Sequence, residues 1–283
     1  MALEPNLACR RWQFEAICLA KGKADVNTVY REPANHISAR IAFDAMRTES
    51  PVQSDFIESK IQVTTFSELT IDGHLTLTQG GSSKALFAFY GAPLQEWFHA
   101  ERAAHDAIMV GAGTVRADNP ELTVRHVVGR NPLRVVPTND GDLPPDSHIL
   151  RDGQPTVLAV PDDLPSDVAA RLAHGAVTLM RCGPGRVDLG LLMAGLAARG
   201  VRSLMVEGGS RLLAALFASG LVDRIVIKHI PVIAGRLPGQ AAGAPFLDSA
   251  DSGLPLSRWH VVDWRVIGGV GVSVYEPLKE LGV

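Results

Sequence analysis

The stretch IMVGAGTVRADNPELTVR, residues 108–125, joins a short apolar strand to two glycines and then to a polar turn. A strand followed by Gly111 and Gly113 is typical of a loop that binds a nucleotide cofactor. The usual dinucleotide fingerprint has a third glycine three residues after the second, and Arg116 stands there instead. The stretch therefore indicates either a nucleotide site of another geometry or tight turns alone.

A second glycine bend follows another apolar strand in LMVEGGSRLLAALF, residues 204–217. Gly208 and Gly209 allow close backbone approach, and the helix that begins after them directs free amides and a positive dipole end at a ligand. A pyrophosphate suits such a place, and the Thr114 hydroxyl after the first bend can also reach a phosphate oxygen. Either bend alone could be a structural turn, but two in one sheet favour binding.

Strands and helices alternate through most of the chain. The expected strands are Ile61–Thr70, Ala107–Val110, Leu133–Val136, Thr156–Val160, Val177–Arg181, Ser203–Glu207 and Arg224–Ile230. Amphipathic patterns between them predict helices, one of them capped by Asp188 and ended by Gly200. Two strands around Gly268-Gly269 predict a C-terminal hairpin. The fold class is therefore α/β, with a mixed, mainly parallel sheet flanked by helices and antiparallel C-terminal strands.

Composition places the chain among ordinary globular proteins. Its 283 residues carry a net charge of −3, which favours neither nucleic acid nor an anionic membrane as partner. Three scattered cysteines, Cys9, Cys18 and Cys182, fit a reducing compartment, and we expect a cytoplasmic protein. Residues 1–60 lack the alternating pattern and are interpreted as an N-terminal helical extension of unknown role, before a main domain at 61–283.

Several polar residues follow the predicted strands and could bind a ligand or serve only as turn residues. They are Asp72, Ser82, Ser83, Asp118, Asn119 and Arg125. No zinc-deaminase signature, Walker loop, nucleophile elbow or zinc-protease motif is present, and no metal site is expected. A fold whose turns are suited to phosphate binding, but which has no evident nucleophile, fits an enzyme of hydride transfer, in which the cofactor supplies the chemistry.

The segments TIDGHL, DAIMVGAGTVRADNPELTVR, NPLRVV, LMVEGG and LVDRIVI occur in that order. Together they resemble the reductase (C-terminal) domain of the bacterial riboflavin-pathway deaminase–reductase, a relative of dihydrofolate reductase. The resemblance covers about residue 61 to the C-terminus. It implies NADPH-dependent reduction of a ribosylaminopyrimidine 5′-phosphate to its ribitylamino form. It also implies a loop without a third glycine, so Arg116 is compatible with nucleotide binding.

The resemblance also implies roles for individual residues. Asp118 would act catalytically beside the nicotinamide, by handling a proton or orienting the carboxamide. The expected cofactor contacts are Glu68, Gly111, Gly113, Thr114, Asp118, Asn139, Gly208, Gly209, Ser210, Arg211, Leu212 and Leu213. The expected substrate contacts are Asp72, Ser82, Arg102, Leu122, Arg125 and Glu207, with the arginines at the phosphate and Glu207 near the sugar or base.

The chain departs from the family pattern in its first strand. Phe66 replaces a frequent lysine and Thr70 replaces a serine, so an ammonium that could bind substrate is expected to be missing. Lys84 stands where a tryptophan often lines the nicotinamide pocket.

A third departure concerns the adenosine end of the cofactor. Pro137 is expected to interrupt the hydrogen bonds of its strand, and the usual aspartate contact would pass to Thr138 or Asn139.

Two alternatives to the riboflavin reductase stay open. One is a reductase of the same fold acting on another pyrimidine, a pteridine or an imine in secondary metabolism. The other is a non-catalytic nucleotide-binding sensor. In each case a homodimer is the expected assembly.

Overall fold

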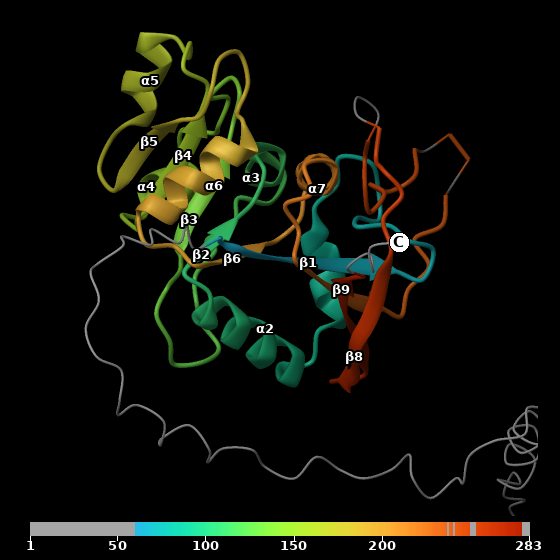
Figure 1. Cartoon of the computed structure of the whole chain (residues 1–283). Helices are drawn as coiled ribbons and strands as arrows, with labels where there is room; N and C mark the ends of the chain where they lie inside the picture. The colour runs from blue at the N-terminus through green and yellow to red at the C-terminus, as the bar shows by residue number, and fades with distance from the viewer. Residues whose placement is uncertain (1–59, 237, 240, 250–252, 279–283) are drawn as a thin grey trace, which may run out of the picture. The chain divides into compact units, whose positions relative to one another are not determined.

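The computed structural model describes residues 60–236, 238–239, 241–249 and 253–278. The N-terminal extension predicted for residues 1–60 lies outside the described residues except for Lys60. Over the described ranges the chain forms a single nine-stranded sheet with helices on both faces (Figure 1). No helix in these ranges is long and apolar enough to cross a membrane.

The strand order is β5-β4-β3-β2-β6-β1-β7-β9-β8. The strands are β1 (Gln62–Thr70), β2 (Ala107–Met109), β3 (Leu133–Pro137), β4 (Thr156–Val160), β5 (Val177–Arg181), β6 (Ser203–Val206), β7 (Arg224–Ile230), β8 (Trp259–Ile267) and β9 (Val270–Pro277). The first seven pair in parallel, and β7–β9 and β9–β8 pair antiparallel. The predicted mixed sheet is confirmed.

The helices divide between the two faces of the sheet, each with its own apolar core. One face is covered by α2 (Ala92–Ala104), α3 (Ala112–Asp118), α4 (His148–Arg151) and α5 (Ser166–Leu172), and the other by α6 (Leu189–Ala198) and α7 (Ser210–Ala218). A 3-10 helix, η2 (Ser83–Phe89), precedes α2. Helices on both faces explain why strands such as β4 are buried along their whole length.

Local sequence signals account for the element ends. The Asp188 carboxylate caps α6 by accepting a hydrogen bond from the Leu191 amide at 3.0 Å, as predicted. The hairpin turn between β8 and β9 holds Gly268 and Gly269 at φ +58° and +85°. A two-residue turn with positive φ at both positions matches the strand twist, and glycine adopts it without strain.

Pro137 interrupts the hydrogen bonding of its strand on one side only, the side of β2. Pro137 is the last residue of β3 and pairs in register with Ala159 of β4. The next amide, that of Thr138, donates to Ala159 O, so the Pro137 nitrogen faces the opposite neighbour, β2. On that side the Val110 amide donates to Val135 O, and the next bond of the parallel ladder would run from the amide of residue 137 to Val110 O. Proline cannot donate it, and the β2–β3 pairing ends at Met109.

Candidate active site

The two glycine bends meet at one edge of the sheet. β2 and β6 are neighbours, with Met109 beside Val206, so the bends that follow them emerge side by side. A Cβ on Gly209 would lie 3.2 Å from Thr114 Oγ1 and 3.9 Å from Gly111 N. Gly208 and Gly209 have φ values of +76° and +95°, which a side chain would strain.

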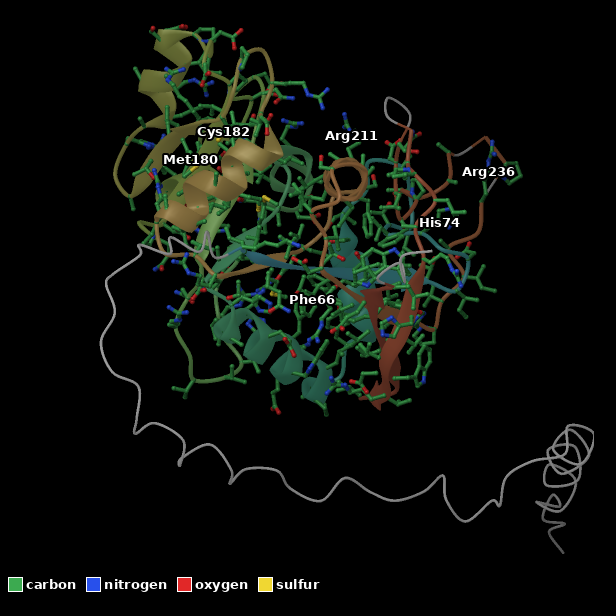
Figure 2. The ribbon with its side chains drawn as sticks, viewed as in Figure 1. Phe66, His74, Met180, Cys182, Arg211 and Arg236 are labelled. Atoms are coloured by element: carbon green, nitrogen blue, oxygen red, sulfur yellow. The ribbon has the colours of Figure 1, made fainter. Side chains whose placement is uncertain are left out.

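The bends form part of the wall of a cavity of about 1490 Å³. The cavity lies at the carboxyl ends of the parallel strands, where ligands bind in open α/β sheets. Of the residues expected at the site, those that line the cavity are Glu68, Gly111, Gly113, Thr114, Asp118, Asn139, Glu207, Gly208, Gly209, Ser210, Arg211 and Leu212. Arg211 lies on α7, and Phe66 lies on β1 (Figure 2).

The helix after the first bend is α3, which begins at Ala112 with Gly111 as its N-cap residue. Thr114 therefore lies in its first turn. The Thr114 hydroxyl lies on the cavity wall beside Gly209.

Asp118 presents a carboxylate to the cavity from the last turn of α3. Its side chain is buried, and its Oδ2 accepts a hydrogen bond from the Ser83 hydroxyl at 2.9 Å. Its Oδ1 has no hydrogen-bond partner among the described residues. An unpaired buried acceptor costs about 1–3 kcal/mol, so this oxygen is suited to a ligand donor.

Four residues expected to contact ligands do not line the cavity and make contacts within the protein. Asp72 accepts hydrogen bonds from Thr70 and from the amides of Ala234 and Gly235, which lower the pKa of its carboxyl and fix the loop after β7. The other three are Ser82, which caps η2, Leu122, which is buried at φ +56°, and Leu213, which is buried in the core.

Arg102 also does not line the cavity, because its guanidinium holds Glu207. Its Nε and Nη2 lie 2.5 and 2.6 Å from the two carboxylate oxygens of Glu207, and Nη1 donates to Thr123 O at 3.1 Å. The pair is bidentate and nearly buried. Arg102 therefore positions Glu207 in the cavity wall, and the expectation that it binds the substrate phosphate directly does not fit this arrangement.

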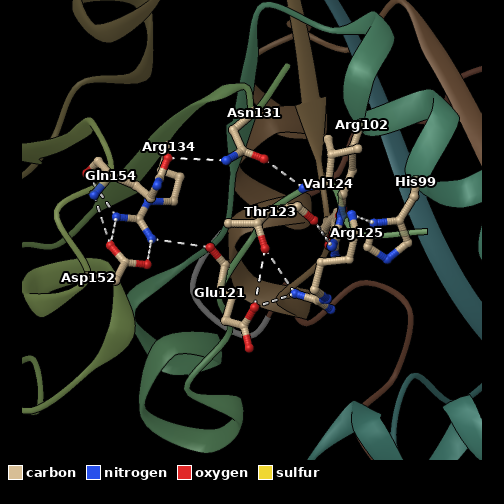
Figure 3. Close-up of polar contacts among 11 residues, drawn as sticks. His99, Arg102, Glu121, Thr123, Val124, Arg125, Asn131, Arg134, Asp152 and Gln154 are labelled. Carbon is tan, nitrogen blue, oxygen red and sulfur yellow. Dashed lines mark hydrogen bonds and ion pairs between the residues drawn. The ribbon is translucent and has the colours of Figure 1, made fainter. Parts of the chain in front are cut away.

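Arg125 points its guanidinium at Glu121, with Nη1 2.8 Å from Glu121 Oε2 (Figure 3). This pair is about half exposed and lies outside the cavity wall. The Arg125 amide donates to His99 Nδ1 at 3.0 Å. Burial, together with the Arg102 and Arg125 charges, lowers the pKa of His99 to about 4, which keeps this nitrogen free to accept.

The part of the cavity wall that follows the ends of β3 and β5 includes residues that the sequence did not predict at the site. Asn139 Oδ1 accepts the Val187 amide at 2.9 Å, which ties the end of β3 to the loop after β5. That loop brings Arg186 to the cavity wall, and α3 brings Arg116. The glycine-rich turn GPG at 183–185 was the available signal, but only the strand order places it beside Asn139.

An ammonium lies behind the inner wall of the cavity. Phe66 is buried against α2, with its ring centroid 6.0 Å from that of Phe98, and does not line the cavity. Lys228 of β7 lies in register beside Glu68 of β1 and forms an ion pair with it. Position 66 lacks the lysine that is frequent in the family, but a lysine is present on the neighbouring strand β7.

Comparison with known proteins identifies the family. The RibD C-terminal domain matches residues 61–268. A 2,5-diamino-6-ribosylamino-4(3H)-pyrimidinone 5′-phosphate reductase of Aquifex aeolicus is 37% identical over 183 residues, or 64% of this chain and 82% of that protein. One of the same name from Methanothermobacter thermautotrophicus is 38% identical over 59% of this chain and 76% of that protein. Riboflavin biosynthesis protein RibD of Chlamydia pneumoniae is 28% identical over 75% of this chain and 58% of its own length.

Solved structures share the fold. The Thermotoga maritima deaminase/reductase superposes with a TM-score of 0.60 at 22% identity, over 78% of this chain and 57% of that one. A pyrimidine reductase-like protein of Corynebacterium diphtheriae gives 0.64 at 18% identity, over 78% and 94%. The family match covers most of the chain and includes both glycine bends and the cavity between them. This chain belongs to the RibD C-terminal domain family.

Proposed function

We propose that this protein reduces a ribosylaminopyrimidine 5′-phosphate to its ribitylamino form with NADPH as hydride donor. The observation that carries the proposal is the meeting of the two glycine bends in one cavity with Asp118 and Glu207. Relatives named as reductases of such a compound support the substrate class. When bound, the reduced nicotinamide would supply a hydride to C1′ of the ring-opened ribose, where a C=N bond accepts it.

The cofactor would lie across the two bends. Gly111, Gly208 and Gly209 leave room for a diphosphate, because no Cβ stands between the backbones. The Thr114 hydroxyl and the first amides of α7 are the donors that would hold it. Asp118 Oδ1 would accept a hydrogen bond from the carboxamide NH₂ and so orient the nicotinamide.

Preference for NADPH over NADH would come from the part of the cavity wall near Asn139, after β3. Arg116 and Arg186 line it near Asn139, and a guanidinium is the group that best binds a 2′-phosphate. Replacing Arg186 by Ala is expected to lower the preference for NADPH over NADH by about tenfold, measured as the ratio of kcat/KM values.

For the substrate, Glu207 is proposed to contact the sugar or base from the cavity wall. Arg125 could reach the phosphate only after leaving Glu121, and such an exposed pair is worth at most about 1 kcal/mol. Arg102 has no such freedom, because its departure would leave Glu207 buried without a partner.

The direct test is NADPH oxidation by the purified full chain. The substrates to compare are the 2,5-diamino-pyrimidinone ribosylamino phosphate, its deaminated uracil counterpart and dihydrofolate. We expect turnover with a ribosylaminopyrimidine phosphate and none with dihydrofolate. Oxidation with another imine or a pteridine alone, or cofactor binding without any oxidation, would contradict the proposed function.

We also propose that the protein forms a homodimer through β8. This strand ends the sheet, and Val261, Val262, Trp264 and Val266 on it are 42–68% exposed. An apolar edge strand exposed to water invites pairing with another chain.

A further inference from the structure

Two ion pairs lie behind the inner wall of the cavity. Glu68 and Glu207 line the cavity from the ends of neighbouring strands β1 and β6. Lys228 lies behind Glu68 and Arg102 behind Glu207. Both cations contact the Phe98 ring, with Lys228 Nζ 3.4 Å and Arg102 Cζ 5.0 Å from its centroid. The pairs differ in one chemical respect, since a lysine can release a proton and an arginine cannot.

The Lys228 side chain is wholly buried, whereas that of Glu68 is 14% exposed and lines the cavity. Beyond the ion pair with Glu68, no oxygen of the described residues accepts a well-aligned hydrogen bond from Lys228 Nζ. Tyr90 donates its hydroxyl proton to Glu68 Oε1, the oxygen that also faces Lys228. Glu68 is thus the link between the cavity and a sealed ammonium. Burying such an ammonium behind one carboxylate costs several kcal/mol, which a purely structural role does not require.

The directions in which the pKa values of Lys228, Glu68 and Tyr90 are shifted agree with this arrangement. Burial lowers the pKa of Lys228, against the opposing attraction of Glu68 and Glu207. Burial acts to raise the pKa of Glu68, but Lys228 and the Tyr90 hydrogen bond outweigh it and hold the pKa below its ordinary value. Burial, with the Glu68 charge, raises the pKa of Tyr90. At rest the proton is therefore on Lys228, which releases it more readily than an exposed lysine would.

We propose that Lys228 stores the proton consumed in the reduction and that Glu68 passes it to the substrate nitrogen. The inference rests on the proposed reduction of a C1′=N bond. As hydride forms the new C–H bond at C1′, the π electrons of C1′=N move to nitrogen, and the Lys228 proton passes through the Glu68 carboxylate to that nitrogen. Glu68 is again a carboxylate after the transfer, and Lys228 is left as a neutral amine that is reprotonated from solvent through Glu68. The dihydronicotinamide is oxidised, and the imine gains one hydride and one proton.

The test compares Lys228→Arg and Glu68→Gln with the wild type, using NADPH and the ribosylaminopyrimidine phosphate. Lys228→Arg keeps the positive charge but cannot release a proton. We expect kcat to fall about 100-fold in both variants, as for loss of a general acid, with the Kd of Lys228→Arg for NADPH within about twofold of the wild type. Wild-type kcat should fall at high pH as Lys228 loses its proton, and Lys228→Arg should lack that decline. Lys60→Met removes an exposed lysine ion pair just before β1 and serves as the matched control.

A structural role for the pair would leave Lys228→Arg with wild-type kcat and an unchanged decline at high pH, and that result overturns the inference. Should Lys228→Arg fail to fold by circular dichroism, Glu68→Gln decides, because unchanged kcat and solvent deuterium isotope effect in that variant also overturn it. A wild-type protein that binds NADPH without oxidising it overturns the proposed function and the proton route together. An active wild type whose variants match it overturns the proton route alone.

Discussion

Asp118 is the residue that we propose to orient the nicotinamide of the cofactor. One carboxylate oxygen is held by Ser83 and the other faces the cavity without a partner. Asp118→Asn would present an amide NH₂ to the carboxamide NH₂ in place of an acceptor, so the nicotinamide would be misaligned. We expect kcat to fall about 10- to 100-fold while the substrate KM changes by less than about threefold. Steady-state kinetics with Asp167→Asn, on the distant helix α5, as control would test this; equal kcat in Asp118→Asn contradicts the role.

His99 makes stability depend on pH. In the folded protein its pKa is about 4, because burial and two nearby arginines disfavour the charged ring, whereas an unfolded histidine titrates near 6.5. Between these values the unfolded chain binds a proton that the folded chain does not, so the free energy of unfolding falls as pH drops from about 6.5 to about 4.

The expected loss is roughly 1–2 kcal/mol after allowing for solvent screening. His99→Asn keeps an acceptor for the Arg125 amide but cannot titrate, so its stability should change less over this window. Urea unfolding at several pH values measures both proteins, and parallel slopes would contradict the assignment.

At the scale of elements, periodicity and turn residues predicted the frame well. The strands Thr156–Val160, Val177–Arg181 and Arg224–Ile230 and the glycine hairpin have the expected bounds, because a buried strand between turn residues is a local signal. The short helices η2 and α4 were missed, since segments of seven and four residues are held by packing more than by their own sequence.

The partners of charged side chains could not be predicted in the same way. Arg102 and Glu207 are far apart in sequence, as are Glu68 and Lys228, and only the strand order and α2 bring them together. The backbone positions of the site were therefore predictable from glycines after strands, whereas the choice of partner for each arginine was not.

Gly209 links the second bend to function. Gly209→Ala would add strain at φ +95° and place a methyl 3.2 Å from Thr114 Oγ1, in the space proposed for the diphosphate. Gly220→Ala is a matched control, because φ there is +62° and nothing lies within 4 Å of the added carbon. Both variants should lose about 1–2 kcal/mol of stability. Only Gly209→Ala should weaken NADPH binding, by roughly tenfold. Equal Kd values in titrations of the two variants would contradict the proposed placement.

For the whole molecule, the exposed apolar edge at β8 predicts the assembly. Light scattering should give about twice the 30.2 kDa chain mass at micromolar concentration. Trp264→Glu places a charge in the middle of that edge and should shift the mass to one chain, while Leu191→Glu on α6, equally exposed, should not. A wild-type protein with the mass of one chain contradicts the dimer.

At the scale of the whole molecule, we propose that the parallel sheet brings two glycine bends from neighbouring strands together to bind one dinucleotide. A crystal structure of the full chain with NADP⁺ and the ribosylaminopyrimidine phosphate would test this placement. We expect the diphosphate between residues 111–114 and 208–210, the carboxamide at Asp118, and C1′ of the substrate beside the nicotinamide. A cofactor bound elsewhere, with both bends empty, would contradict it.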